Sequence, residues 1–364
     1  MSLRKSISYF FFPLSIWYAV GVAFRNFLFA VGLKRQSAPH ITTIGVGNLC
    51  TGGTGKTPHV EYLLQLFADK YPTAMLSRGY KRKTRGFLLD DGSHDAALLG
   101  DEPAMIARRF PQVQVAVCEK RVEGVHRLMA SSDQSDTKNT PQLIILDDVF
   151  QHRSIKPNIN ILLTEYSKPY YKDRILPFGD LREFRSARER AGIVVVTKCP
   201  QNLNPIDKHN IIHDLRLQNY QKVFFSYLKY GMLRTLDGDE VDINLRRMDS
   251  VLAVTGIANP KPMLDELGRN CRVQHLGFPD HHAYTKGDIS RIRETFDAMG
   301  GEHKIIVTTA KDAMRLQGLT DDLPVYVLPV TVAFFKEPDL DFDQVIESSV
   351  RENISFLKKL SIWS

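Results

Sequence analysis

The sequence predicts an α/β fold, with a doubly wound parallel sheet followed by a second, smaller α/β domain and preceded by an apolar helix. Short apolar runs alternate with amphipathic helical patterns along the first half of the chain, and a glycine-rich loop follows the first of these runs. The N-terminal segment combines aromatic with basic side chains. At 364 residues the chain is long enough for two ordinary domains. We expect the parts to span residues 1–35, 36–215 and 216–364.

The N-terminal segment is a cationic block. It has no Asp or Glu before Glu61. Within it, Tyr9 to Phe24 is uncharged and rich in aromatic residues. Its basic residues include Arg4, Lys5, Arg25, Lys34 and Arg35. An excess of positive charge beside an apolar run suits the anionic headgroups of a membrane surface.

Several interpretations of this apolar run remain open. A helix that crosses a bilayer needs about 20 apolar residues, and Arg25 interrupts the run. A cleaved secretory signal needs a small-residue cleavage site, for which residues 30–32 (AVG) are a stretched match. We favour a helix lying at the membrane interface. Four residues at helical spacing form one narrow stripe along this helix, and aromatic and aliphatic residues cover its other sides. The stripe consists of Ser15, Tyr18, Val22 and Arg25. The remaining alternative is a helix packed on the protein's own core.

Residues 50–57 (CTGGTGKT) are predicted to be a phosphate-binding loop of the P-loop type. The pattern G-x-x-x-x-G-K-[ST] is complete except at its first position, where Cys50 replaces glycine. A buried strand at 41–46 precedes the loop, and an amphipathic helix at 58–69 follows it. Glycines let backbone N–H groups approach an anion closely, and the helix N-terminus adds positive potential. A glycine-rich turn that binds nothing is the weaker interpretation.

We therefore assign nucleotide phosphates to this loop, with Lys56 reaching the outer phosphates and Thr57 offering its hydroxyl to Mg²⁺. The predicted nucleotide-binding residues are Cys50, Thr51, Gly52, Gly53, Thr54, Gly55, Lys56 and Thr57.

The remaining strands and helices are predicted from the spacing of apolar residues and from local composition. In the first domain we expect strands at 73–77, 113–117, 143–146, 159–163 and 193–197, and helices at 101–110 and 121–130. In the second we expect strands at 223–227, 251–255, 304–308 and 325–328, and a closing helix from about 341 to 360.

Two adjacent acids follow the strand at 143–146. Asp147 and Asp148 emerge at the carboxyl end of a buried strand, where ligands bind in open α/β sheets. One of them should hold Mg²⁺ that bridges the outer phosphates. Because neighbouring side chains alternate in direction, the two carboxylates should have different roles. A solvated acidic turn is the alternative.

Composition excludes some classes of protein. The four cysteines are far apart in the sequence, which suggests neither a zinc site nor a disulfide framework and fits a reducing cytosol. The net charge of +7 suits an anionic partner without distinguishing nucleic acid, phospholipid and phosphorylated sugar. A guanine-nucleotide switch is disfavoured because Gln151, three residues after Asp148, stands where glycine is expected. The partitioning ATPases carry a lysine where this chain has Thr51.

Eight blocks of sequence occur in order along the chain: GVGNLCTGGTGKTP, MLSRGYKRKTRG, GDEP, ILDDVFQH, ILPFGDLRE, GIANP, FPDHHAY and TTAKDAMRL. Taken together, they resemble the tetraacyldisaccharide 4'-kinases, the membrane-associated bacterial enzymes that phosphorylate the lipid A precursor. The resemblance covers nearly the whole chain. The chain departs from the family at Cys50 and Thr51, where Thr-Val or a similar pair is usual, and at Val149, which replaces the glycine of D-D-G-F-Q. A β-branched residue cannot easily adopt glycine conformations.

The resemblance implies transfer of the γ-phosphoryl of ATP, with Mg²⁺, to the 4'-hydroxyl of a tetraacyl disaccharide 1-phosphate. It implies a peripheral or monotopic protein on the cytoplasmic side of the bacterial inner membrane, acting on an acylated disaccharide phosphate lipid, with no nucleic acid and no obligate protein partner. The competing hypothesis is a membrane-associated P-loop ATPase that uses hydrolysis as a switch to recruit partners.

The resemblance also implies catalytic residues beyond Lys56. A carboxylate paired with a histidine serves as the base, which falls on Asp101 of GDEP and His281 of FPDHHAY, with His282 as the rival. Asp101 could equally be a helix N-cap. The candidates for holding the substrate phosphate are Arg78, Arg82 and Arg121, because arginine binds phosphate bidentately. For the basic run around Arg78 and Arg82, a solvated loop is the commoner explanation.

Overall fold

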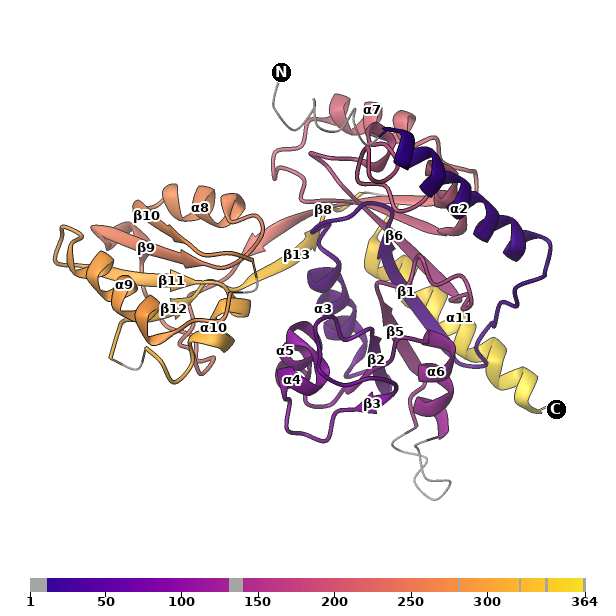
Figure 1. The fold of residues 1–364 in the computed structure, drawn as a ribbon, viewed down its shortest axis with the longest axis horizontal. Helices are drawn as coiled ribbons and strands as arrows, with labels where there is room; N and C mark the ends of the chain where they lie inside the picture. Colours follow the sequence, from indigo (N-terminus) through magenta and orange to yellow (C-terminus); the bar gives the residue numbers. More distant parts are fainter. Residues whose placement is uncertain (1–11, 131–139, 281, 321, 338–339, 363–364) are drawn as a thin grey trace. The chain divides into compact units, whose positions relative to one another are not determined.

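The computed structural model describes residues 12–130, 140–280, 282–320, 322–337 and 340–362. The chain forms two compact units, Met1–Leu228 with Val332–Ser364, and Lys229–Thr331. Each unit has helices packed on a parallel or mostly parallel sheet (Figure 1). The predicted α/β fold class is therefore confirmed.

The first unit is built on a nine-stranded sheet in the order β13-β8-β7-β6-β1-β5-β2-β4-β3. All pairs from β8 to β4 are parallel, and β3 is antiparallel to β4. Parallel pairing brings the carboxyl ends of the central strands to one edge of the sheet. The strands are β1 (Thr42–Asn48), β2 (Thr73–Ser77), β3 (Leu88–Leu89), β4 (Gln114–Val117), β5 (Leu143–Asp147), β6 (Ile159–Glu165), β7 (Ile193–Thr197), β8 (Lys222–Tyr230) and β13 (Val330–Phe334).

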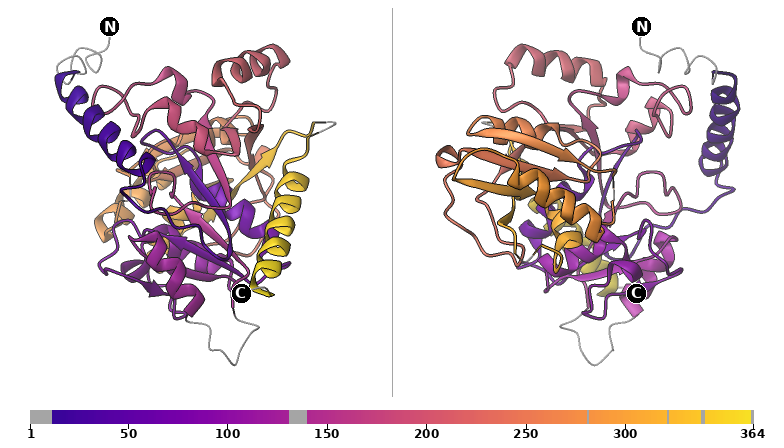
Figure 2. Two further views of the ribbon diagram at one scale, coloured as in Figure 1. Left: turned by 90° about the vertical axis from the view of Figure 1, so that its right-hand side faces the viewer. Right: turned by 60° about the vertical axis from the view of Figure 1, so that its left-hand side comes forward.

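Helices cover both faces of this sheet (Figure 2). Helices α3, α5 and α11 contribute to the core that contains Ile145, whereas α6 packs in the core that contains its neighbour Ile144. Adjacent residues of β5 thus face opposite cores, as the period of a strand requires. The helices of the first unit are α2 (Phe12–Ala30), α3 (Lys56–Phe67), α4 (Ala96–Leu99), α5 (Asp101–Arg109), α6 (Arg121–Ala130), α7 (Pro205–Leu215) and α11 (Phe342–Ile362).

The C-terminal helix α11 belongs to the first unit. Phe342, Ile346 and Val350 are buried in the same core as α3, and Tyr62 Oη donates a 2.6 Å hydrogen bond to Asp343 Oδ1. The expected second domain at 216–364 therefore differs from the structure, in which that unit spans Lys229–Thr331. The reason is that the apolar stripe of α11 is buried against α3.

The second unit has a four-stranded parallel sheet in the order β10-β9-β11-β12. Helices α9 and α10 contribute to one of its cores and α8 to the other. Its elements are β9 (Ser250–Thr255), α8 (Lys261–Gly268), β10 (Arg272–Gly277), α9 (Lys286–Asp297), β11 (Lys304–Thr308), α10 (Ala310–Leu316) and β12 (Val325–Val327).

Helix α2 turns its apolar side away from the core. It continues through Arg25 and is long and apolar enough to cross a membrane. Its buried residues, Ser15 and Val22, belong to the stripe that the sequence singles out. The interpretation that its apolar side packs on the protein's own core is therefore wrong. Large side chains on the other sides are exposed: Phe12 by 52%, Trp17 by 75%, Phe24 by 61% and Phe27 by 56%.

Candidate functional site

The glycine-rich loop leaves the central strand β1 and enters α3, as predicted. Gly52 and Gly55 have φ of 105° and 89°, a left-handed region that favours glycine. Cys50 does not require glycine, because its φ is not positive. Its side chain is buried, and its backbone forms an antiparallel bridge with Leu181. The replacement of the first glycine is therefore compatible with the backbone of the loop.

Buried polar groups hold this loop in shape. The Asn48 side-chain amide donates to Cys50 O at 2.8 Å and to Thr54 Oγ1 at 2.9 Å. Thr197 Oγ1, at the end of β7, donates to Thr54 O at 2.8 Å. His59 Nδ1 lies 2.7 Å from Gly55 O. Burial lowers the pKa of His59 to about 4, so a neutral imidazole supports the loop at neutral pH.

Lys56 and Arg182 meet at the carboxylate of Asp148. Lys56 Nζ lies 3.7 Å from Asp148 Oδ1 and 3.5 Å from Asn48 Oδ1. An Arg182 Nη donates to both oxygens of Asp148, at 3.3 and 3.2 Å. Although burial raises the pKa of Asp148, the charges of Lys56 and Arg182 outweigh it and hold the pKa below its ordinary value. Asp148 is therefore ionised at neutral pH.

Asp147 and Asp148 point to different partners. Asp148 has φ 46°, a left-handed conformation that Asp tolerates, which turns it away from the line of β5. Asp147, the last residue of β5, is buried, and its Oδ2 accepts a 3.1 Å hydrogen bond from Ser77. Val149 needs no positive φ and packs near Gly45 in the core. The departure from the family at Val149 thus leaves the backbone unstrained.

Asp147 is poised to accept a cation. Its Oδ1 is buried and has no hydrogen-bond partner. Burial, and the nearby negative charges of Glu102 and Asp148, raise its pKa to about 6. A positive charge bound at this oxygen would relieve both the desolvation and the repulsion.

Glu102 is a site residue that the sequence did not reveal. Thr57 Oγ1, at the start of α3, donates a 2.8 Å hydrogen bond to Glu102 Oε2, from the first turn of α5. Within the described residues, no three His, Cys, Asp or Glu side chains converge as a complete metal site.

Asp101 lies in the first turn of α5, next to Glu102. Gly100, with φ 93°, occupies the N-cap position and makes no side-chain cap. The alternative role of Asp101 as an N-cap is therefore wrong, and its acidic side chain lies at the positive end of the helix.

The three predicted phosphate-binding arginines have different environments. Arg78 is exposed at the end of β2. Arg82 has a side chain only 2% exposed and donates to Gly86 O and Glu119 Oε1, both at 2.6 Å, which closes the loop after β2. Arg121, at the start of α6, is 1% exposed and donates to Cys118 O at 2.6 Å and Asp147 O at 2.9 Å.

His152 is a second residue that the sequence analysis did not single out. Burial, together with the positive charges of Arg121 and Arg78, lowers the pKa of His152 to about 4. These side chains therefore share a region of positive potential, where the imidazole stays neutral.

His281 lies outside the described residues. Its neighbour His282 stacks on Phe278 with ring centroids 5.0 Å apart and meets the edge of Tyr284 at 5.2 Å. His282 Nε2 lies 3.0 Å from Oδ2 of Asp288, a residue that also completes the capping box of α9 with Thr285. His282 is thus engaged within the second unit.

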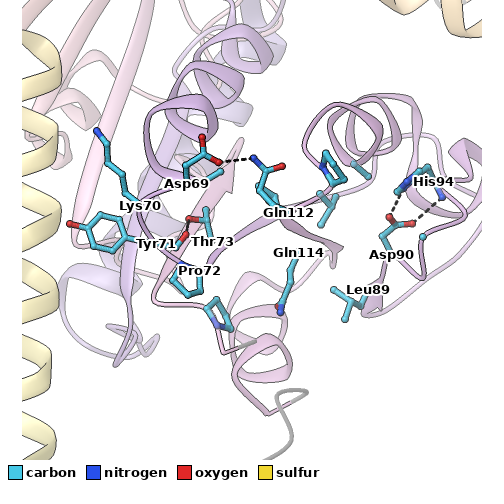
Figure 3. A pocket seen from close by; sticks show the side chains of 17 residues that line it. Asp69, Lys70, Tyr71, Pro72, Thr73, Leu89, Asp90, His94, Gln112 and Gln114 are labelled. Carbon is cyan, nitrogen blue, oxygen red and sulfur yellow. Dashed lines mark hydrogen bonds and ion pairs between the residues drawn. The ribbon is translucent and has the colours of Figure 1, made fainter. Parts of the chain in front are cut away.

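A cavity of about 640 Å³ lies at the other edge of the sheet in the first unit (Figure 3). It is lined by residues before β2 and β4, such as Tyr71 and Gln112, and by the pair of His94 Nδ1 and Asp90 Oδ2, 2.6 Å apart. None of the site residues predicted from the sequence lines it.

The chain is similar to known kinases over most of its length. Residues 7–351 match the family Tetraacyldisaccharide-1-P 4'-kinase. The tetraacyldisaccharide 4'-kinase of Bacteroides thetaiotaomicron is 41% identical over 358 residues, covering 94% of this chain and 93% of that one. That of Flavobacterium johnsoniae is 40% identical over 352 residues, covering 97% and 98%. A crystal structure of LpxK from Aquifex aeolicus in complex with ATP is similar with a TM-score of 0.73 and 29% identity, covering 97% of this chain and 100% of that one.

Proposed function

The chain belongs to the tetraacyldisaccharide-1-phosphate 4'-kinase family, and from this premise we propose how its residues transfer the phosphoryl group. It is an ATP-dependent kinase of lipid A biosynthesis that acts on a tetraacyl disaccharide lipid. The alternative of a P-loop ATPase switch is not favoured, because the similar proteins described above are named tetraacyldisaccharide 4'-kinases.

The loop at residues 50–57 holds the triphosphate of ATP. Its left-handed glycines and buried supports keep the backbone near the N-terminus of α3, where amide groups bind anions. The ammonium group of Lys56 neutralises the outer phosphates of ATP. To do so it exchanges its ion pair with Asp148 for one with the phosphates.

Thr57, Asp147 and Asp148 would hold Mg²⁺. The observation that supports this is the buried, unpartnered Oδ1 of Asp147 beside a second ionised carboxylate. When bound, the ion neutralises charge on the outer phosphates and helps to orient them.

Asp101 acts as the general base for the 4'-hydroxyl, and His281 is the second catalytic residue of the proposal. Asp101 takes the hydroxyl proton as the oxygen forms its bond to the γ-phosphorus and the bond to the ADP oxygen breaks. Its place beside Glu102, the partner of Thr57, supports this role. His282 positions the segment instead, because its imidazole is engaged with Asp288 and two aromatic rings.

The lipid substrate binds through its phosphate and its acyl chains. Arg78 and Arg121 supply the positive potential for the 1-phosphate, while Arg82 supports the loop that carries Arg78. Helix α2 lies at the cytoplasmic face of the bacterial inner membrane, with its exposed aromatic side chains in the bilayer interface. No nucleic acid or obligate protein partner is required by this mechanism.

The observation that carries the proposal is the meeting of the phosphate loop, through Lys56 and Thr57, with the acids Asp148 and Glu102 at the carboxyl edge of the sheet. The test is Asp101→Asn. We expect phosphate transfer to the lipid to fall at least about 100-fold, within the range for loss of a general base, while the Kd for MgATP stays within about twofold. Equal loss of transfer and of ATP affinity would refute the assignment of Asp101 as base.

A further inference from the structure

One short segment contacts both the phosphate loop and helix α2. This segment, residues 178–183 (FGDLRE), is called the strap below. It lies in the first unit, between β6 and β7 in the chain. In the sequence it is distinguished only by its part in the family resemblance.

On one side the strap pairs with the start of the phosphate loop. Thr51 N donates to Asp180 O at 2.7 Å, and Arg182 N donates to Leu49 O at 2.7 Å. The Thr51 hydroxyl adds a 3.1 Å hydrogen bond to Asp180 Oδ1. The Arg182 guanidinium then reaches Asp148, as described above. The strap therefore contacts two of the groups proposed to bind MgATP.

On its other side the strap contacts three polar residues of α2, namely Ser15, Tyr18 and Arg25. Phe178 N donates to Ser15 Oγ at 2.9 Å, and Tyr18 Oη donates to Arg182 O at 3.0 Å. Arg25 lies 3.0 Å from the fully buried carboxylate of Glu183, which Arg190 also contacts at 2.8 Å. Arg182 thus accepts a hydrogen bond from α2 through its carbonyl and binds Asp148 through its side chain.

We propose that Ser15 and Tyr18 of helix α2 are positioning residues for the nucleotide site, acting through the strap on Leu49–Thr51 and Asp148. The inference rests on the proposed function only in taking the loop at 50–57 as the ATP site. It adds that α2 does more than attach to a lipid surface. Since coupling between two binding events is reciprocal, the state of α2 sets the affinity for ATP, and ATP sets the affinity of α2 for the surface.

The experiment uses the full chain in detergent and compares Ser15→Ala/Tyr18→Phe with the unaltered protein. This double variant removes two hydroxyls and keeps the aromatic ring. Ala23→Ser is the matched control, because it adds a hydroxyl on an exposed position of the same helix. The readouts are the Kd for MgATP by calorimetry and the hydrogen exchange of the Thr51 and Arg182 amides without nucleotide.

We expect the double variant to raise the Kd for MgATP by about threefold to tenfold, as for the loss of one or two hydrogen bonds. Exchange of both amides should become faster, while the control variant matches the unaltered protein. Vesicles of anionic phospholipid should tighten ATP binding to the unaltered protein more than to the double variant.

Unchanged amide exchange would overturn the inference, since α2 would then not hold the strap. Faster exchange with an unchanged Kd would also overturn it, because the strap would then not position the nucleotide. If the unaltered protein bound no MgATP, the proposed function would fail, whereas the exchange comparison would still decide whether α2 holds the loop.

Discussion

Lys56 Nζ lies 3.7 Å from Oδ1 of Asp148, whose carboxylate also binds Arg182 at 3.2 Å. Two cations that suit a phosphate are therefore paired with one acid. Incoming phosphate must compete for them. When Mg²⁺ accompanies the nucleotide, the carboxylate of Asp148 is needed to bind the metal ion. Removing this carboxylate should therefore favour ATP without Mg²⁺ and impair the reaction with Mg²⁺.

Asp148→Asn should tighten the binding of ATP in the absence of Mg²⁺ by about threefold to tenfold, because Lys56 is no longer paired with an anion. With Mg²⁺, phosphate transfer should fall at least about 100-fold. Calorimetry with EDTA and with Mg²⁺ measures the first effect, and labelled ATP measures the second. Weaker binding of ATP under both conditions would argue against competition between Asp148 and the phosphates.

The affinity for MgATP should depend on pH through Asp147. The pKa of this carboxyl is raised to about 6 by burial and by neighbouring acids, so it is protonated below that pH and ionised above it. Only the ionised form attracts Mg²⁺, and the Kd for MgATP should therefore rise about tenfold for each pH unit below 6. Titration of the Kd from pH 7.5 to 5 checks this.

Asp147→Asn is the control for that titration, since ATP itself also binds protons. The variant should bind MgATP weakly and should lack the component of the pH dependence that Asp147 contributes. An identical pH profile in both proteins would mean that another group is responsible.

Glu102→Gln should move this pH dependence to lower pH. The negative charge of Glu102 is the largest contribution to the raised pKa of Asp147 after burial, and its removal lowers that pKa. The Thr57 hydroxyl, which donates to Glu102 Oε2 at 2.8 Å, keeps a neutral acceptor in the variant. A midpoint that stays at the same pH would show that the charge of Glu102 does not reach Asp147.

The exposed side of α2 should bind lipid vesicles. Replacing Phe12, Trp17 and Phe24 together with Ser removes large exposed apolar side chains and should abolish sedimentation with anionic vesicles. Ala23→Ser is the control for a small polar change on an exposed position of this helix. Unchanged sedimentation of the triple variant would count against the membrane-interface helix, and a thermal unfolding scan would check that the fold is intact.

His281 and His282 should differ in their effects on turnover. His282 is bound to Asp288 at 3.0 Å, so His282→Gln should lower kcat by about threefold to tenfold through the loss of positioning. His281→Gln should lower kcat by about 100-fold with little change in the KM for ATP. The reverse order of the two kcat values would assign the catalytic role to His282.

Much of the first unit was predictable because its signals are local. The phosphate loop, the strand that precedes it and the acids at the end of β5 are each read from about a dozen consecutive residues. The prediction that Asp147 and Asp148 take different partners followed from the alternation of side chains along a strand. The left-handed backbone of Asp148 was not visible in the sequence.

The interactions that the sequence did not reveal connect distant parts of the chain. The hydrogen bond between Thr57 and Glu102 joins residues 45 positions apart in the sequence, and the one between Tyr18 and Arg182 joins residues 164 positions apart. Arg82 belongs to a basic cluster in the sequence, but its side chain is buried and donates a hydrogen bond to Glu119, which follows β4. The last helix, α11, follows the second unit in the sequence, and its packing in the core with α3 places it in the first unit.

The most direct test of the account is the fate of the γ-phosphate of labelled ATP, incubated with the purified protein, Mg²⁺ and a tetraacyl disaccharide 1-phosphate in mixed micelles. We expect label in the lipid at its 4'-position, and at least about 100-fold less label with Lys56→Ala. Release of all the label as inorganic phosphate, at a rate that the lipid does not change, would contradict it.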